Sequence, residues 1–428
     1  MLLKKTFSVF LQLCMITQTC MARDVLPQIE LYTPDYSRAY NNVSSVYQFI
    51  KRFSSLYATY VRLDDRQTSL KGHPLYLMRL TNFSVPEARK IKVLFSYGEH
   101  PREFFPVESM RFFLLDVMNS LSGFGMAKKK IVFMLNNVDL FVLPLVNPDG
   151  RLYIEKTFNY CWRGTSRGVD LNRNFDWEFG GPGSSDSQTD EEYRGLYPFS
   201  EPEARFLADV ANRFTFDVFV SFHSGVRQIF IPFSDSKSKM SARHHYNEAS
   251  ELSLASLIAA AAGHHFKFNV AHVLNDYPAD GTSFDYMAGV KQIPFSLAIE
   301  MWGEGDGNGV KCFDLFNPSG SDLAEALLTI NPIYNVIFQQ VVEWKTMRYQ
   351  HSHTLSYHSE VRMLQDKKED ELRSNVMWTL QFLCFLLLLL FAAAYFRRQR
   401  QPCRTLINLG RKQRIVRLKN LSDTLCIT

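Results

Sequence analysis

The sequence has no internal repeat, and charged residues make up only 21% of its 428 positions. Hydrophobic residues account for 46% and aromatic residues for 14%. This composition excludes a disordered or low-complexity protein, because it supplies enough apolar surface for a folded core. The length alone suggests two or three domains.

An evenly spread positive charge is also lacking. The formal net charge is +5, but residues 397–428 hold nine Lys or Arg residues and one Asp. The rest of the chain is therefore acidic overall. A nucleic-acid partner is excluded on this ground, because such a partner requires a basic surface on the folded domain.

Two apolar segments stand apart from the rest of the chain. Residues 1–22 combine a short basic start, an apolar run and a small residue at the end. This pattern predicts a signal peptide that is cleaved after Ala22. A buried amphipathic helix is the alternative interpretation.

The second apolar segment, residues 376–396, has 21 residues and no charge. At about 1.5 Å per residue, a helix of this length spans about 31 Å, the thickness of the hydrocarbon core of a bilayer. Trp378 and Tyr395 lie near its ends, and an arginine cluster follows. These features predict a single-pass type I protein of a secretory-pathway or cell-surface membrane. The tail at 397–428 is then cytosolic and residues 23–375 are lumenal or extracellular, whereas a core helix is the alternative.

Cysteine is scarce, with seven residues in total, and only Cys161 and Cys312 lie in the predicted lumenal region. Two cysteines in an oxidising compartment predict one disulfide, with two separate buried thiols as the alternative. Asn42 and Asn82 each begin an Asn-x-Ser sequon in this region. Both are therefore predicted glycosylation sites.

The region at 23–348 alternates between two patterns of hydrophobicity, and residues 349–375 are predicted to form a juxtamembrane stalk. Short apolar runs predict buried strands at 91–97, 139–146, 218–222 and 295–299. Helical spacing predicts helices at 46–57, 104–118, 248–263 and 333–344. Ser200 and Glu203 have the spacing of a capping box that opens a further helix, and residues 147–150 have turn composition. The alternation predicts an α/β fold, namely an α/β/α sandwich with a mixed, mostly parallel central sheet.

Four residues that can bind metal or transfer protons stand at the ends of predicted strands. They are His100, Glu103, His223 and Glu300. The ligand crevice of an open α/β sheet lies outside the carboxyl ends of its strands, so these side chains are expected to meet. Two His and one Glu form a catalytic zinc set, and the remaining Glu can then act as a base.

Four motifs occur in a characteristic order. They are residues 98–103 (GEHPRE), 148–150 (PDG), 168–175 (GVDLNRNF) and 221–224 (SFHS). In these motifs the chain resembles zinc metallocarboxypeptidases of the carboxypeptidase A type, over roughly residues 40–345. It looks like a divergent, membrane-anchored eukaryotic member of that family.

The resemblance implies a role for individual residues. The implied ligands of one Zn²⁺ per chain are His100, Glu103 and His223; carboxypeptidase A is itself the standard example of such a His₂Glu site. The implied catalytic residues are Glu300 as general base and Arg163 as oxyanion stabiliser, with Asp170 orienting the first histidine. The implied substrate-binding residues are Arg102, Asn172, Arg173, Tyr277 and Phe284. The implied reaction is hydrolysis of the last peptide bond, which releases single C-terminal amino acids from peptides or proteins.

The specificity of the implied pocket rests on two residues. Phe284 aligns with the floor of the family's pocket, and an apolar floor favours apolar C-terminal residues, because it would leave a buried cationic side chain unpaired. Asp235 lies one position from where basic-specific members carry an acid, so C-terminal Lys or Arg would be preferred if it turned inward. We expect Asp235 to be a solvated loop acid instead.

The chain departs from the pancreatic members in three respects. Gly225 replaces an aromatic residue, residues 301–303 read MWG, and too few residues precede His100 for a long inhibitory pro-domain. No zymogen step is therefore expected. Two other functions stay open: a catalytically silent, membrane-anchored binding protein on the same fold, and a zinc-dependent N-acyl amino acid deacylase. The sequence does not indicate an oligomeric state.

Overall fold

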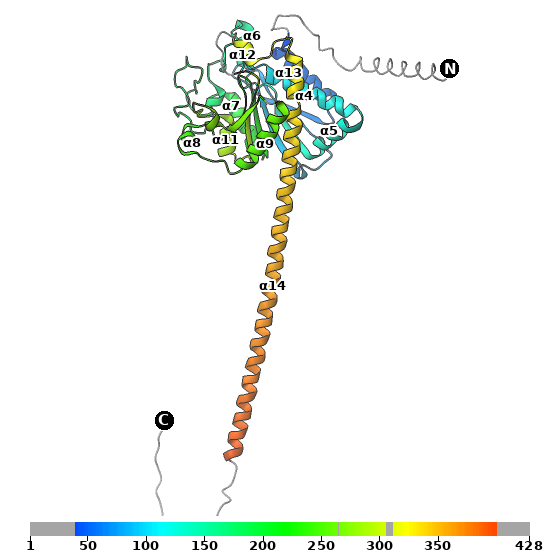
Figure 1. The fold of residues 1–428 in the computed structure, drawn as a ribbon, viewed down its shortest axis with the longest axis vertical. Coiled ribbons are helices and arrows are strands. Elements are labelled where there is room, and N and C mark those ends of the chain that lie inside the picture. Colours follow the sequence, from blue (N-terminus) through cyan, green and yellow to red (C-terminus); the bar gives the residue numbers. More distant parts are fainter. Residues whose placement is uncertain (1–38, 264, 305–310, 400–428) are drawn as a thin grey trace, which may run out of the picture. The chain divides into compact units, whose positions relative to one another are not determined.

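The computed structural model describes residues 39–263, 265–304 and 311–399 (Figure 1). The predicted signal peptide and most of the predicted basic tail lie outside these ranges. Residues up to Arg348 form one compact unit, and residues from Tyr349 form a second.

The first unit is built on an eight-stranded sheet with the order β1-β2-β4-β3-β5-β8-β6-β7. Its strands are β1 (Val61–Thr68), β2 (Pro74–Leu80), β3 (Ile91–Tyr97), β4 (Val138–Leu143), β5 (Val218–His223), β6 (Arg227–Ile231), β7 (Lys267–Val270) and β8 (Phe295–Met301). The neighbours β4, β3, β5 and β8 run parallel to one another, and β6 is parallel to β7. The pairs β1–β2, β2–β4 and β6–β8 are antiparallel. The sheet is mixed and mostly parallel, as predicted.

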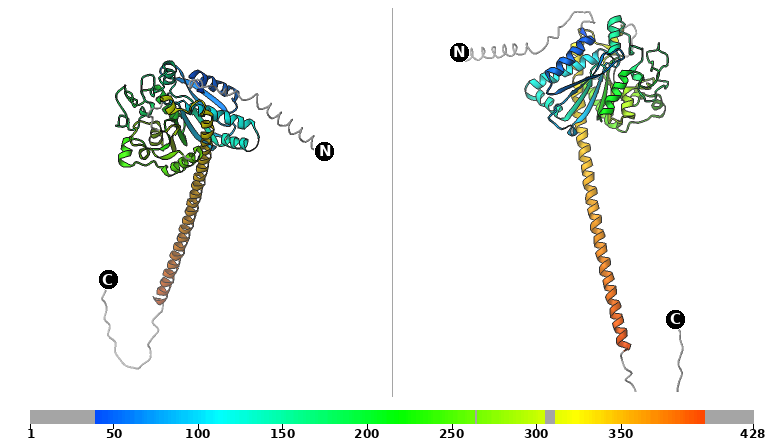
Figure 2. Two further views of the ribbon diagram at one scale, coloured as in Figure 1. Left: turned by 45° about the horizontal axis from the view of Figure 1, so that its top comes forward. Right: turned by 180° about the vertical axis from the view of Figure 1, so that it is seen from behind.

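Helices cover both faces of this sheet (Figures 1 and 2). The helices are α3 (Val43–Leu56), α4 (Phe105–Ser122), α5 (Gly125–Asn137), α6 (Pro148–Thr157), α7 (Pro202–Arg213), α8 (Ser236–Ser241), α9 (Glu248–Ala262), α10 (Ala271–Leu274), α11 (Ser283–Gly289), α12 (Cys312–Phe316), α13 (Leu323–Ile330) and α14 (Pro332–Gln399), with the 3₁₀ turns η1 (Glu87–Arg89) and η2 (Leu171–Arg173). One core cluster joins the sheet to α3, α4, α9, α13 and the start of α14. A second cluster joins it to α7 and α11. The fold is thus an α/β/α sandwich.

The strand β3 shows how the sequence divides between the two layers. Its residues Val93 and Phe95 belong to one cluster, whereas Leu94 between them belongs to the other. Successive side chains of a strand point to opposite faces, so a strand covered on both faces is apolar at most positions. This is why the central strands were predictable as continuous apolar runs.

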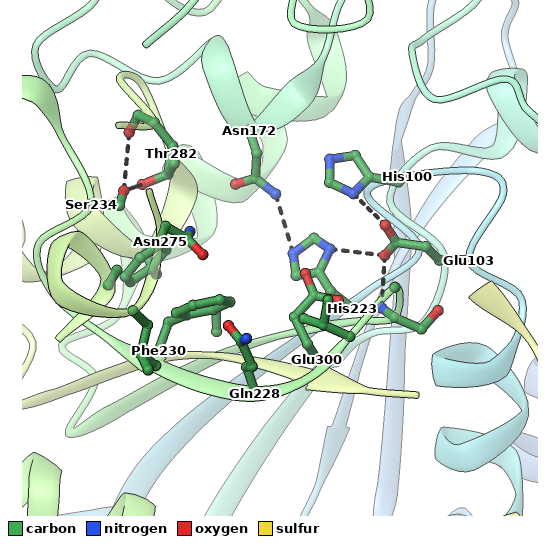
Figure 3. A pocket seen from close by; sticks show the side chains of 18 of the residues that line it. His100, Glu103, Asn172, His223, Gln228, Phe230, Ser234, Asn275, Thr282 and Glu300 are labelled. Carbon is green, nitrogen blue, oxygen red and sulfur yellow. Dashed lines mark hydrogen bonds and ion pairs between the residues drawn. The ribbon is translucent and has the colours of Figure 1, made fainter. Parts of the chain in front are cut away.

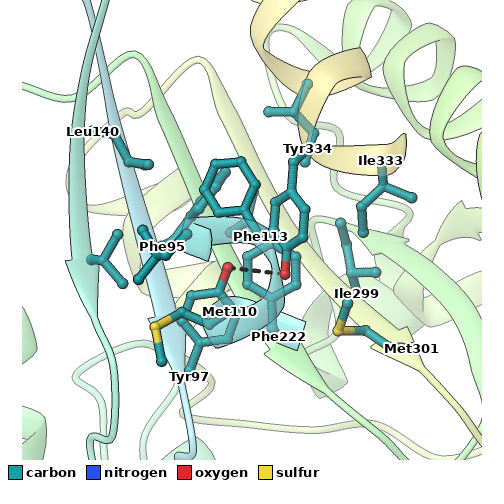
Figure 4. Close-up of a cluster of buried hydrophobic side chains, with 14 of the residues drawn as sticks. Phe95, Tyr97, Met110, Phe113, Leu140, Phe222, Ile299, Met301, Ile333 and Tyr334 are labelled. Atoms are coloured by element: carbon teal, nitrogen blue, oxygen red, sulfur yellow. Dashed lines mark hydrogen bonds between the residues drawn. The ribbon is translucent and has the colours of Figure 1, made fainter. Parts of the chain in front are cut away.

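The start of α14 is fixed to the sheet by aromatic side chains (Figure 4). Tyr334 stacks on Phe113 with ring centroids 4.3 Å apart. Its hydroxyl accepts a hydrogen bond from Tyr97, at 3.2 Å, and lies 2.9 Å from the hydroxyl of Ser109. Full burial of one such side chain contributes about 2–3 kcal/mol. The hydroxyl pairs also remove the cost of burying polar groups among apolar ones.

Two local predictions were wrong. The segment read as a turn at 147–150 is the first turn of α6, where the Asn147 side chain accepts a hydrogen bond from Gly150 N and Pro148 occupies the first helical position. The capping box does not form, because α7 begins at Pro202 and its N-cap residue, Glu201, makes no side-chain cap bond. Ser200 instead donates its hydroxyl hydrogen to Glu201.

The second unit is the continuation of α14. The helix runs without interruption through the segment predicted as a stalk. Residues Arg362–Gln399 are long and apolar enough to cross a membrane by length and composition, and the most apolar window is not buried among the described residues. The absence of burial disfavours the alternative of a core helix.

Candidate active site

Three neighbouring parallel strands end at one edge of the sheet, and the polar residues singled out from the sequence gather there. His223 is the last residue of β5 and lies opposite Glu300 of β8 in the strand register. His100 and Glu103 follow β3, the neighbour of β5 on its other side. The strand-end argument therefore predicted the meeting point of these four side chains.

A glycine allows the chain to turn out of β3 toward the cleft. Gly98 has a φ of +69°, which favours glycine. A Cβ atom at this position would also lie 2.7 Å from Leu145 Cδ1. The backbone angle therefore favours glycine at the first position of the polar motif, whereas the flexible Leu145 side chain could shift away from a Cβ atom.

His100, Glu103 and His223 form a compact buried cluster (Figure 3). Glu103 Oε1 lies 2.7 Å from His100 Nδ1, and Glu103 Oε2 lies 2.9 Å from His223 Nδ1. One donor atom from each residue lies within 4.8 Å of the others. Burial alone would raise the pKa of Glu103, but the two facing imidazoles hold it well below its usual range. Two imidazoles and an ionised carboxylate that converge on one point fit the donor set of a catalytic Zn²⁺.

Asp170 connects this cluster to a cationic side chain. Its Oδ1 lies 3.1 Å from His100 Nε2, and its Oδ2 accepts a hydrogen bond from Arg163 Nε at 2.8 Å. Burial would raise the pKa of Asp170, yet Arg163 and His100 hold it well below its usual range. The ionised carboxylate thereby fixes the orientation of both side chains.

Glu300 faces the cluster from β8. The pKa of Glu300 is raised to about 7, mainly by burial and secondly by the negative charge of Glu103. The Oε2 atom of Glu300 is buried and has no hydrogen-bond partner among the described residues. A carboxyl group in this state can take up or release a proton near neutral pH.

These residues line a cleft with a volume of about 520 Å³. Every catalytic, ligand and substrate-binding residue inferred from the resemblance contributes to its wall, whereas Asp170 lies behind it. Arg173 donates from Nε to Gly183 O and from Nη1 to Asn172 O, both at 2.8 Å, which fixes its guanidinium. Tyr277 is 62% exposed.

Arg102 occupies the same wall. It donates from Nη1 to Cys161 O at 2.9 Å and lies over the ring of Phe316, 4.3 Å from the ring centroid. Its charge also pairs with Glu191 at 3.0 Å. With Arg163 and Arg173, it makes this wall of the cleft cationic.

The expectation for Asp235 was wrong. The residue is fully buried, and it caps α8 by accepting hydrogen bonds from Ser238 N at 2.9 Å and from Ser238 Oγ at 2.7 Å. Trp177 Nε1 donates to the same carboxylate. Asp235 is therefore not a solvated loop acid, and it is not among the residues that line the cleft.

Several cleft residues were not predicted from the sequence. They include Gln228, Phe230, Ser234, Asn275, Thr282 and Ala298 (Figure 3 labels all except Ala298). Gln228 and Phe230 lie two apart on β6 and so share a face of the sheet. The spacing is a usable signal, but only after β6 has been recognised as a strand.

Cys161 and Cys312 form a disulfide, with their Cα atoms 5.2 Å apart. This confirms the prediction of one bridge, and the alternative of two buried thiols was wrong. The bond joins the segment that carries Arg163 to α12.

The segment at 164–168 matches the Gly-x-Ser-x-Gly pattern of a serine-hydrolase elbow. That function requires a strand before the serine and a helix after it. Here Ser166 lies in the turns between α6 and η2, away from any strand end. The match therefore has no nucleophile-elbow geometry.

Comparison with known proteins agrees with this site. Residues 46–327 match the zinc carboxypeptidase family. Human carboxypeptidase O is 26% identical over 302 residues, which cover 68% of this chain and 78% of that protein. Mouse carboxypeptidase A1 is 26% identical over 303 residues, which cover 68% of this chain and 69% of that protein.

Solved structures show the same fold. Bovine thrombin-activatable fibrinolysis inhibitor, in complex with tick carboxypeptidase inhibitor, has a TM-score of 0.61 at 23% identity and covers 71% of this chain and 98% of its own. Carboxypeptidase A from Helicoverpa armigera has a TM-score of 0.62 at 19% identity and covers 79% and 86%. The chain belongs to the zinc carboxypeptidase family and is a zinc metallocarboxypeptidase, a hydrolase.

Proposed function

We propose that this carboxypeptidase releases single amino acids from the C-termini of peptides or proteins on the lumenal or extracellular side of a membrane. One observation carries the proposal: a single cleft holds the His-Glu-His cluster, the carboxyl group of Glu300 and a cationic wall. Each of these parts has a distinct task in the cleavage of a C-terminal peptide bond.

His100, Glu103 and His223 would hold one Zn²⁺, with Asp170 orienting His100. When bound, such an ion polarises a carbonyl oxygen and activates a water molecule. Glu300 is the general base and acid in this proposal. With a pKa of about 7, it can accept a proton at the start of the reaction and pass it to the leaving amine.

Arg173 and Asn172 are proposed to bind the terminal carboxylate of the substrate. Two donors of Arg173 are used by backbone carbonyls, and its remaining donors are available for a planar carboxylate. Because the carboxylate is gripped at a fixed distance from the reacting groups, only the last peptide bond can be cut. This supports the release of one residue at a time.

Arg163 is proposed to stabilise the oxyanion that develops at the cut bond. A single donor of this kind contributes roughly 3 kcal/mol to transition-state stability. Arg102 would provide a further cationic subsite for the substrate. Tyr277, exposed as it is, would close over the bound peptide.

The specificity pocket is proposed to accept apolar C-terminal residues. Phe230, Phe284 and Ala298 give it an apolar wall. Asp235 is buried away from the cleft and bonded to α8, so it offers no partner for a cationic side chain. Burial of an unpaired Lys or Arg there would cost several kcal/mol.

The proposed domain organisation follows the sequence analysis. A signal peptide at 1–22 would direct the catalytic domain at 23–348 into the secretory pathway. Residues 349–375 would connect it to a transmembrane helix at 376–396, with the tail at 397–428 in the cytosol. The apolar length of Arg362–Gln399 supports the anchor.

The test is a peptide panel assayed with the full-length, detergent-solubilised protein. Peptides that differ only in the last residue should each lose that residue, with Leu and Phe preferred over Lys and Arg. Matched peptides with an amidated C-terminus serve as the control and should be cleaved at least a hundredfold more slowly. Equal cleavage of the amidated set would contradict carboxylate recognition. Cleavage of N-acyl amino acids alone would favour the deacylase, and inactivity toward all of them would favour a silent binding protein.

A further inference from the structure

A buried carboxylate to which the sequence analysis assigns no role lies beside the His-Glu-His cluster. Glu99 is 1% exposed. Its Oε1 accepts hydrogen bonds from Ser96 Oγ at 2.6 Å and from Ser221 Oγ at 2.7 Å. Its Oε2 accepts from Asn172 Nδ2 at 2.7 Å and from Ser283 Oγ at 3.2 Å. All four of these hydrogen-bond partners are neutral, although a carboxylate at this depth is costly to bury without a cationic partner.

Among the described residues, the basic group within ion-pair distance of Glu99 is an imidazole of the cluster. His223 Nε2 lies 3.8 Å from Glu99 Oε2, too far for a direct hydrogen bond. Ser221 Oγ bridges the gap, because it lies 2.7 Å from His223 Nε2 and 2.7 Å from Glu99 Oε1. A carboxylate can only accept, so Ser221 donates to Glu99 and can accept from the Nε2–H group of His223.

This order of donors places a hydrogen on Nε2 of the histidine. The other ring nitrogen, Nδ1, faces Glu103 and is the atom that would bind the metal once its own hydrogen is displaced. Asn172 Nδ2 also approaches His223 Nε2, at 3.2 Å, but its shorter contact is with Glu99 Oε2. The Asn172 amide is held in this orientation because its oxygen accepts from Ser283 N at 2.9 Å.

The two histidines of the cluster thus have corresponding environments. His100 turns its Nε2 directly to the buried carboxylate of Asp170, at 3.1 Å. His223 turns its Nε2 to a buried carboxylate through one hydroxyl. A carboxylate behind a histidine orients the ring and makes its other nitrogen a stronger metal ligand.

We propose that Glu99, acting through Ser221, is a positioning residue that orients His223 for metal binding. The proposal rests on the proposed zinc site. His100, the sequence neighbour of Glu99, would be a direct ligand in that site, and Glu99 would be an outer partner of His223, the second histidine ligand.

The test compares two serines that bond to the same oxygen of Glu99. Ser221 contacts His223, whereas Ser96 does not. Zn²⁺ affinity is measured by competition with a chelator in the full-length, detergent-solubilised protein. Ser221→Ala should weaken Zn²⁺ binding by 10–100-fold, and Ser96→Ala should change it by less than about threefold. Glu99→Gln should weaken Zn²⁺ binding as well. The double variant Glu99→Gln/Ser221→Ala should bind Zn²⁺ about as weakly as Glu99→Gln alone, because both changes break the same relay, the hydrogen-bonded chain from Glu99 through Ser221 to His223.

A spectroscopic measurement separates positioning from general stability. In the Co²⁺-substituted protein, Ser221→Ala should shift the visible absorption bands and Ser96→Ala should not, although both variants lose one hydrogen bond to Glu99. Wild-type affinity in Ser221→Ala, or equal losses in both serine variants, would overturn the relay. The comparison of Ser221→Ala with Ser96→Ala tests the proposal even if Glu99→Gln fails to fold. His223→Ala separates the two proposals. If His223→Ala abolishes Zn²⁺ binding while Ser221→Ala has no effect, the zinc site is supported and the role of Glu99 is rejected. A wild-type protein that binds no Zn²⁺ rejects both proposals.

Discussion

Glu203 allows a pH-dependent test of how much the ionisation of a buried acid destabilises this fold. The residue lies in the first turn of α7 and is 1% exposed. The backbone N–H groups of Leu70 and Glu203 approach its carboxylate, but neither oxygen has a well-aligned hydrogen bond among the described residues. Burial, and next the negative charge of Asp149, raise its pKa from 4.5 to about 7.

This rise sets the direction and the size of the effect on stability. Since the folded-state pKa lies above the unfolded-state value, the contribution of Glu203 is fully present below about pH 4.5 and is lost as the pH rises to about 7. At about 1.4 kcal/mol per pH unit, the loss amounts to about 3 kcal/mol. Glu203→Gln removes the ionisation, so the variant should gain stability relative to the wild type across this interval.

The assay is the free energy of unfolding in urea, measured between pH 4 and pH 8 for wild type and variant. The difference should be small at pH 4, grow with pH and level off above pH 7. Glu325→Gln, at an exposed position, should leave the pH profile unchanged. A Glu203→Gln variant with the same pH slope as the wild type would refute the reasoning.

Four further predictions concern the site and the topology. His223→Ala should lose most of its zinc in metal analysis, and full occupancy would reject this ligand set. Glu300→Gln should fold, keep zinc and lose roughly 10²–10⁴-fold in turnover, whereas near-normal turnover would assign the base elsewhere. Glycan mapping should find Asn42 modified more completely than Asn82. Asn42 uses only its side-chain oxygen in the helix cap, whereas the side-chain nitrogen of Asn82, which would carry the glycan, donates a hydrogen bond to Asn136. Equal occupancy at the two sites would argue against this reasoning. On intact vesicles, an N-terminal epitope placed after residue 22 should resist added protease and a C-terminal tag should not; the opposite result would reverse the topology.

Central and peripheral strands differed in how well the sequence predicted them. The strands β3, β4, β5 and β8 are covered on both faces, so their sequences are mostly apolar on both faces and could be recognised. The edge strand β1 reads VRLDDRQT and is mostly exposed, because only one neighbour pairs with it. Its identity as a strand comes from pairing with β2, a non-local contact that local hydrophobicity does not report.

The same distinction applies to the candidate site. His223 and Glu300 could be placed because each stands at the end of a recognisable strand. Gln228 and Thr282 line the cleft only through the pairing of β6 with β8 and the loop before α11, which no local pattern encodes. Glu99 was overlooked for a different reason: an isolated Glu in a polar motif has the sequence signature of a solvated residue, and only its burial reveals otherwise.

The disulfide between Cys161 and Cys312 has a consequence for the unfolded chain. The two residues are 151 positions apart, so the bond closes a loop that includes β5, β6, β7 and β8. Closing a loop of this length removes conformational entropy from the unfolded state worth about 5 kcal/mol. That amount is comparable to the whole stability of many domains, about 5–15 kcal/mol. The catalytic domain therefore reaches its full stability only where thiols are oxidised, and a copy left in a reducing compartment would spend far more time unfolded and open to degradation.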